Sequence, residues 1–146
     1  MGTLVTTVAA AVLAMTVSSG AQAPEPLPPS LSGRYTVVPP GGRAIIDYWK
    51  LRLDGDGAPG PVKGRIDWRG RGCGALDEPA AGTWDGTELK LEFKARPDVN
   101  TQMMGATYCG EGKANVVLRR KPGTRDFDGE GTLNDRPPTF QVTASP

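Results

Sequence analysis

Histidine is absent from the sequence. Its absence excludes catalysis by a histidine base, Ser-His-Asp triads and metal sites with histidine ligands. Serine is absent between Gly33 and Ala144, so the Gly-x-Ser-x-Gly turn that presents a nucleophilic serine is missing as well. The chain has no Gly-Lys-Ser/Thr phosphate-binding loop, and no Gly-x-Gly-x-x-Gly motif opens a helix. An enzyme built on carboxylates, as in two-carboxylate glycosidases, is the least supported alternative. We therefore expect a protein without enzymatic activity and without a cofactor.

The acidic loops have the wrong spacing for a calcium site. Asp54-Gly-Asp-Gly begins like a calcium loop, but Arg65 stands at the twelfth position, where a bidentate glutamate is required. A second acidic run begins at Asp126 and has Pro137 at its twelfth position. We therefore expect no metal site.

An excess of charge of either sign is also lacking. The chain has 17 lysine and arginine residues against 16 aspartate and glutamate residues, and none of them lies in the first 23 positions. A general nucleic-acid binder carries a strong basic excess. We therefore expect no nucleic-acid partner.

The N-terminal residues 1–23 predict a secretory signal peptide, because an apolar run is followed by small residues. Cleavage fits after Ala21 or after Ala23, and the awkwardness of Pro24 as a first mature residue favours Ala21. The apolar run is shorter than the roughly 20 residues of a membrane-spanning helix, and no such run follows it. We expect a secreted or periplasmic protein with no membrane span once the signal is removed.

The remaining chain is expected to form one domain behind a short tether. Residues 24–30 are rich in proline and predict a stiff, extended leader that lies outside the core. Residues 31–146 have the length of a single all-β domain.

Cysteine is scarce, because the sequence contains two cysteines, Cys73 and Cys109. An isolated pair in an oxidising compartment usually forms a disulfide. Closing a loop of this size removes on the order of 4 kcal/mol of unfolded-state entropy. The sequence therefore predicts a disulfide between these two residues.

Alternation of apolar and polar residues with a period of two predicts β-strands. The clearest example is Leu89, Leu91 and Phe93, which alternate with charged residues. Asp-Gly at 85–86 and Pro-Gly at 122–123 are typical of turns between antiparallel strands. The predicted strands cover 33–37, 48–53, 62–69, 88–94, 104–108, 114–118, 127–133 and 140–142.

We expect an all-β fold of eight or nine antiparallel strands in an up-and-down meander. A small β-barrel is the first interpretation and a two-sheet β-sandwich is the second, because one-sided burial of each strand suits both. The opening Gly33-Arg34-Tyr35, the length and the meander resemble small ligand-binding barrels such as lipocalins and avidins. Those families usually open on Gly-x-Trp, and the resemblance carries no binding residue across.

Burial sets the register of the predicted hairpin around residues 54–60. Leu53 and Val62 are apolar and stand on either side of the loop, so we pair them on the core side. Trp49 then lies opposite Ile66.

The outer face of this hairpin is basic. The register puts Lys50 opposite Arg65, and it puts Arg52 opposite Lys63. Directly opposed like charges destabilise a strand pair by up to about 1 kcal/mol. The compensating charge comes either from a neighbouring acidic strand or from an external anionic partner. The anion-binding candidates are Lys50, Arg52, Lys63 and Arg65, and the candidate acidic neighbours are Glu88 and Glu92.

A two-residue turn at 122–123 pairs Leu118 with Phe127 in the core and Arg120 with Arg125 at its rim. In a barrel these two arginines stand at one mouth. The tryptophans are expected in the core, where they either line a ligand cavity or fill the interior. The ligand-binding candidates are Trp49, Trp68, Trp84, Arg120 and Arg125.

The sequence therefore predicts a secreted or periplasmic, non-catalytic binding protein. In the first version, a small apolar or amphipathic ligand occupies the barrel. In the alternative, an envelope or surface-interaction protein, such as a hydrolase inhibitor or a binder of anionic polymers, uses the basic strand face. A cavity of about 300 Å³ or more favours the first version, and a filled interior favours the second.

Overall fold

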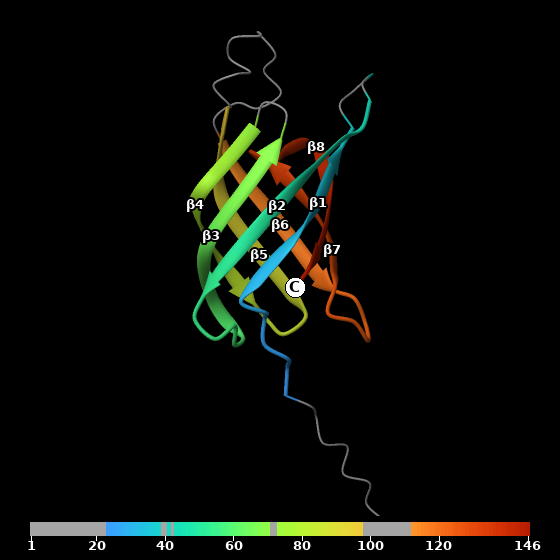
Figure 1. Ribbon diagram of the computed structural model, residues 1–146. Coiled ribbons are helices and arrows are strands. Elements are labelled where there is room, and N and C mark those ends of the chain that lie inside the picture. The colour runs from blue at the N-terminus through green and yellow to red at the C-terminus, as the bar shows by residue number, and fades with distance from the viewer. Residues whose placement is uncertain (1–22, 39–40, 42, 71–72, 98–111) are drawn as a thin grey trace, which may run out of the picture.

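The structure is a computed structural model that describes residues 23–38, 41, 43–70, 73–97 and 112–146. Those residues form eight antiparallel strands that close into a β-barrel (Figure 1). None of them is helical, so no described segment is a helix that could cross a membrane. The strands are β1 (Ser30–Val37), β2 (Ile45–Asp54), β3 (Gly60–Gly70), β4 (Cys73–Trp84), β5 (Glu88–Pro97), β6 (Gly112–Arg120), β7 (Phe127–Leu133) and β8 (Arg136–Ser145).

Each strand pairs with the next one along the chain, and β8 returns to pair with β1. Tyr35 of β1 marks this closure, because it lies between Asp47 of β2 and Val142 of β8. The predicted all-β meander and its barrel are therefore confirmed, and the two-sheet sandwich is not formed. Closure removes the free edges of the sheet.

β4 is the strand that the alternation does not predict. Its sequence is rich in glycine and alanine and includes Pro79, residue types that are depleted in strands. Ala80 and Trp84 are nevertheless buried, with exposed residues between them. The predicted strand at 104–108 lies outside the described residues, and the other seven predicted strands coincide with β1, β2, β3, β5, β6, β7 and β8.

The first hairpin differs from the predicted register by two residues. Leu53 pairs with Gly64 and not with Val62, and Trp49 pairs with Trp68, two residues beyond its expected partner. The start of β3 runs past the end of β2 and pairs with β4 alone, as the stagger of strands in a closed barrel requires. Because the shift is an even number of residues, each side chain keeps its predicted face.

The second hairpin shows the same two-residue shift. Arg120 pairs with Phe127, although we expected Leu118 to do so. The connection spans residues 121–126 and is longer than the predicted two-residue turn. Arg125 consequently lies in an exposed loop, and the expected pair between Arg120 and Arg125 does not form.

The inward-facing residues of the strands form one core. We call the end of the barrel where β3 ends, at the top of Figure 1, the upper end. Trp68 lies two residues before that end, and its ring stacks on Tyr35 with 4.2 Å between the ring centroids. The lower part of the core contains Trp84, whose ring centroid lies 6.0 Å from that of Phe127. The largest fully buried aliphatic side chains are Leu31, Leu51, Ile66, Leu89, Leu118 and Val142.

The leader at residues 24–30 is not the separate tether that we expected. Leu27 is only 3% exposed and belongs to the core. Its N–H donates to the carbonyl oxygen of Gly57 at 2.9 Å, and the N–H of Leu53 donates to the carbonyl oxygen of Pro29 at 2.9 Å. The proline rings restrict the undocked leader to few conformations. Docking it against the lower end of the barrel therefore costs little conformational entropy.

Replacing Leu27 by alanine tests whether the leader belongs to the folded unit. We expect Leu27→Ala to lower the free energy of unfolding by about 3 kcal/mol, because it leaves a cavity in the core. Urea denaturation followed by tryptophan fluorescence measures the change. Leu76 is 64% exposed, so Leu76→Ala is a matched control that should cost less than about 0.5 kcal/mol. Equal effects of the two substitutions would contradict the placement of the leader.

Candidate functional site

The two-residue shift separates both expected like-charge pairs, Lys50–Arg65 and Arg52–Lys63. Lys50 and Lys63 instead face carboxylates across the ladder, while Arg52 lies opposite Arg65. The basic strip is therefore interrupted by acidic residues. The facing residues are Asp67 for Lys50 and Asp54 for Lys63.

Asp77 of β4 bridges the two opposed arginines. Its Oδ1 accepts hydrogen bonds from Arg52 at 2.9 Å and from the Nε of Arg65 at 2.7 Å, and its carbonyl oxygen also accepts from Arg65. Asp67 accepts from Arg52 at 3.0 Å and from the N–H of Asp77 at 2.9 Å. The compensating carboxylates therefore come from β3 and β4, and not from β5 as expected. The acids of β5, Glu88 and Glu92, pair with Arg119 and Lys113 of β6.

This network holds a bulge in β4. Asp77 has a φ of 48°, in the left-handed region, and lies where the register of β4 shifts against both neighbouring strands. On β5, Lys94 and Ala95 have no partner residue on β4. The hydrogen bond and charge of Arg65, aided by Arg52, hold the pKa of the Asp77 carboxyl below its usual value. Two of the four anion-binding candidates are thus engaged in holding the barrel wall.

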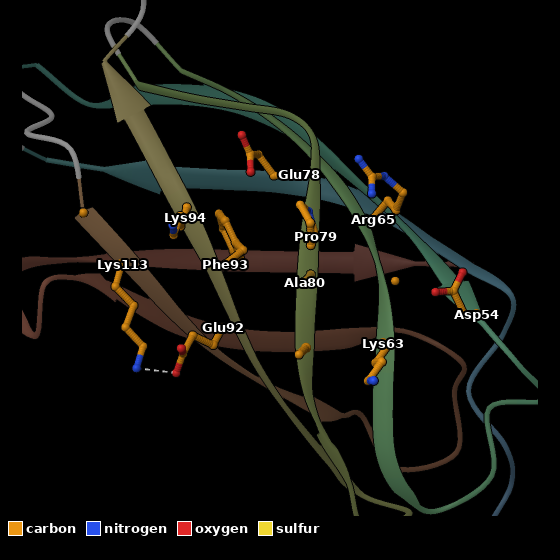
Figure 2. A pocket seen from close by; sticks show the side chains of 13 residues that line it. Asp54, Lys63, Arg65, Glu78, Pro79, Ala80, Glu92, Phe93, Lys94 and Lys113 are labelled. Carbon is orange, nitrogen blue, oxygen red and sulfur yellow. Dashed lines mark ion pairs between the residues drawn. The ribbon is translucent and has the colours of Figure 1, made fainter.

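An open groove of about 900 Å³ lies beside this bulge, on the outer wall over β3 to β6 (Figure 2). Glu92 forms an ion pair with Lys113 inside it. Lys63 and Lys94 form no ion pair with any described residue (Figure 2). The groove carries both signs of charge and is not a continuous basic surface. Its other charged residues are Asp54, Arg65 and Glu78.

The upper interior of the barrel contains two of the three tryptophans. Trp49 donates its indole N–H to the carbonyl oxygen of Thr143 at 3.2 Å, and its ring centroid lies 6.1 Å from that of Trp68. Asp47, half-buried on the inward side of β2, lies opposite Tyr35. Burial, and then the charge of Asp47, raise the pKa of the Tyr35 hydroxyl.

The third tryptophan, Trp84, lies at the opposite end with Arg120. The guanidinium carbon of Arg120 is 5.1 Å from the centre of the Trp84 ring and 5.3 Å from that of Phe127. Its NH1 forms an ion pair with Glu25 of the leader at 3.1 Å. The three tryptophans therefore lie toward two different ends of the barrel, and Arg120 lies against the core instead of standing free at a mouth.

An exposed apolar patch on β1 and β2 was not anticipated from the sequence. Ile46 and Tyr48 are 58% and 61% exposed on the outer face of β2, and Val38, 57% exposed, follows β1. Arg34 of β1 places its guanidinium 5.2 Å from the centre of the Tyr48 ring. The available signal was a break in the alternation, because two apolar residues in succession occur at Ile45-Ile46 and again at Tyr48-Trp49. We call Arg34, Val38, Ile46 and Tyr48 the β1–β2 patch.

The predicted disulfide falls partly outside the described residues. Cys73 begins β4, whereas Cys109 lies in the segment 98–111. Within the described ranges, no group of three or more potential ligands is placed to hold a metal ion.

The pKa of Asp77 tests the network that holds the bulge. Because its folded pKa is below the unfolded value of about 3.9, the carboxylate stabilises the fold above that pH. The contribution is lost as the pH falls from about 4 through the lower folded pKa. We expect Arg65→Gln to return the pKa of Asp77 toward its usual value in an NMR titration. Lys63→Gln removes a cation from the same strand without touching Asp77 and should leave that pKa unchanged; equal shifts would refute the network.

Comparison with protein-family models, with curated proteins and with solved structures found no match.

Proposed function

We propose that the chain is a secreted or periplasmic, non-catalytic protein that binds another protein through the outer wall of its barrel. The observation that carries this proposal is the β1–β2 patch, where three large apolar side chains are more than half exposed. Single exposed apolar residues are ordinary on protein surfaces, but neighbouring ones mark interaction sites.

The composition of the patch supports a protein partner. Tyrosine and arginine, together with tryptophan, are the residue types enriched among residues that dominate binding energy in protein interfaces. Arg34 and Tyr48 already stack on one another, so their side chains lose little further freedom on binding. Arg34 and Tyr48 also lie opposite each other in the ladder between β1 and β2, which fixes their spacing.

The interior supports a role for the outside of the molecule. Trp68 contacts Tyr35, Phe93 and Phe140, whose ring centroids lie 4.2, 5.4 and 5.2 Å from its own. These rings come from four strands. They occupy volume that a small-molecule site in this part of the interior would need.

The charged groove argues against an anionic polymer as the partner. Arg52 and Arg65 are already bound by carboxylates. Lys63 and Lys94, which pair with no carboxylate in the described part of the chain, have Asp54 and Glu92 nearby in the groove. A surface of both signs complements a folded protein better than a uniformly charged chain.

Export and a disulfide belong to the same proposal. Residues 1–23 have the features of a signal peptide, and a bond between Cys73 and Cys109 would close a loop outside the cytoplasm. Mass determination of the mature protein with and without reducing agent tests both features. We expect a chain that begins at Gln22 or Pro24 and whose mass rises by that of two hydrogen atoms when the reducing agent converts the disulfide to two thiols.

A ligand in the upper interior is the second candidate function, favoured by Asp47. A carboxylate half-buried beside aromatic rings suits an amphipathic molecule with a positive group. Native mass spectrometry of the protein purified from its own host tests this candidate. A co-purified small molecule supports it, and bare protein contradicts it.

Photo-crosslinking tests the β1–β2 patch. The photoreactive amino acid p-benzoylphenylalanine replaces Tyr48 in one variant and Glu130, on the outer face of β7, in a control variant. We expect one dominant protein adduct at position 48 in the native host and no such adduct at position 130. The identified partner is then purified, and Tyr48→Ala should weaken its binding about tenfold, as loss of a dominant interface residue does.

The proposal fails if position 48 gives no discrete adduct. It also fails if Tyr48→Ala and Glu130→Ala change the affinity for the purified partner equally.

A further inference from the structure

A separate pocket of about 540 Å³ lies at the lower end of the barrel, apart from the groove and the β1–β2 patch. It is bounded by Glu25 of the leader, by the turn at Gly86 and Thr87, and by the loop between β6 and β7. Its lining contains a single carboxylate but three cationic side chains, Arg120, Lys121 and Arg125.

Arg120 is fixed in this pocket without any ligand. Its side chain is 13% exposed and lies against the rings of Trp84 and Phe127. One of its terminal nitrogens donates to the carbonyl oxygen of Pro26 at 3.1 Å. Its Nε is buried and has no hydrogen-bond partner among the described residues. A guanidinium held in this way is preorganised for a planar or tetrahedral oxyanion.

The carboxylate of Glu25 forms an ion pair with this guanidinium. One of its oxygens lies 3.1 Å from Arg120, and the other lies 3.7 Å from Arg125, which is too long for a hydrogen bond. The Nζ of Lys121 forms an ion pair with a carboxylate oxygen of Asp128 at 3.0 Å. Glu25 therefore satisfies only part of the positive charge around the pocket, while its own side chain is 54% exposed.

We propose that this pocket binds an oxyanion, the carboxylate or phosphate group of a ligand, and that Glu25 is its internal competitor. A ligand that engages Arg120 and Arg125 together can make a hydrogen bond to Arg125 that Glu25, at 3.7 Å, does not make. Because Glu25 is tethered to the fold, it competes at an effective concentration on the order of millimolar. Binding of the external anion releases residues 24–29 from the lower end, so occupancy of the pocket is coupled to docking of the leader.

Isothermal titration calorimetry with sodium phosphate and with sodium acetate tests the site. Glu25→Gln keeps the shape of the side chain but removes its charge, and we expect it to bind the anion about threefold more tightly than the wild-type protein. Arg125→Gln should weaken binding by a similar factor. Arg119→Gln is the matched control, since Arg119 is adjacent in sequence but pairs with Glu88 outside the pocket.

Hydrogen exchange of the Leu27 amide tests the competition itself. This N–H is bonded to Gly57 in the docked leader, so saturating phosphate or acetate should speed its exchange in the wild-type protein. Binding of either anion with this response supports the proposal and identifies the preferred group. The proposal is overturned if Glu25→Gln binds neither anion, if Arg119→Gln weakens binding as much as Arg125→Gln, or if the exchange of Leu27 does not change.

Discussion

The packing of Trp68 against rings from four other strands is the constraint on which the structure depends. Its ring centroid lies between 4.2 and 6.1 Å from those of Tyr35, Trp49, Phe93 and Phe140. Such pairs contribute about 0.5 to 1.5 kcal/mol each beyond the burial of their area. Rings from β1, β2, β5 and β8 can meet on β3 only if the sheet curls and closes. The same rings occupy part of the upper interior.

The charged side chains on the outer wall form ion pairs with one another that stabilise the fold. Arg52 and Arg65 lie opposite each other, and Asp67 and Asp77 offset the repulsion by bridging them. In doing so they hold a bulge that separates β4 from β5 and opens the groove. The lower end follows the same principle, since Arg120 stacks on the core and binds the leader. Three of the cations that the sequence suggests for a ligand, Arg52, Arg65 and Arg120, are thus engaged first by the protein's own carboxylates.

Much of the fold could be predicted from the sequence, because strict alternation at residues such as Leu89, Leu91 and Phe93 leaves one arrangement that buries one face. Both hairpin registers were wrong by two residues, since burial fixes the face of Leu53 or Phe127 but not the stagger that closure imposes. The alternation did not predict β4, because glycine, alanine and proline are residue types that are depleted in strands. No local pattern encodes contacts between residues that are distant in the sequence. The sequence therefore did not predict that Asp77 bridges two arginines, that Leu27 is part of the core, or that Glu25 pairs with Arg120.

Nuclear Overhauser contacts of the Trp68 ring in solution test the central claim most directly. The account predicts contacts from its ring protons to those of both Phe93 and Phe140 in one set of resonances, because the ring centroids lie 5.4 and 5.2 Å apart. Those phenylalanines stand on β5 and β8, which share no ladder. Absence of either contact would mean that the sheet does not close or that these rings do not pack together inside the barrel. Either result would contradict the account.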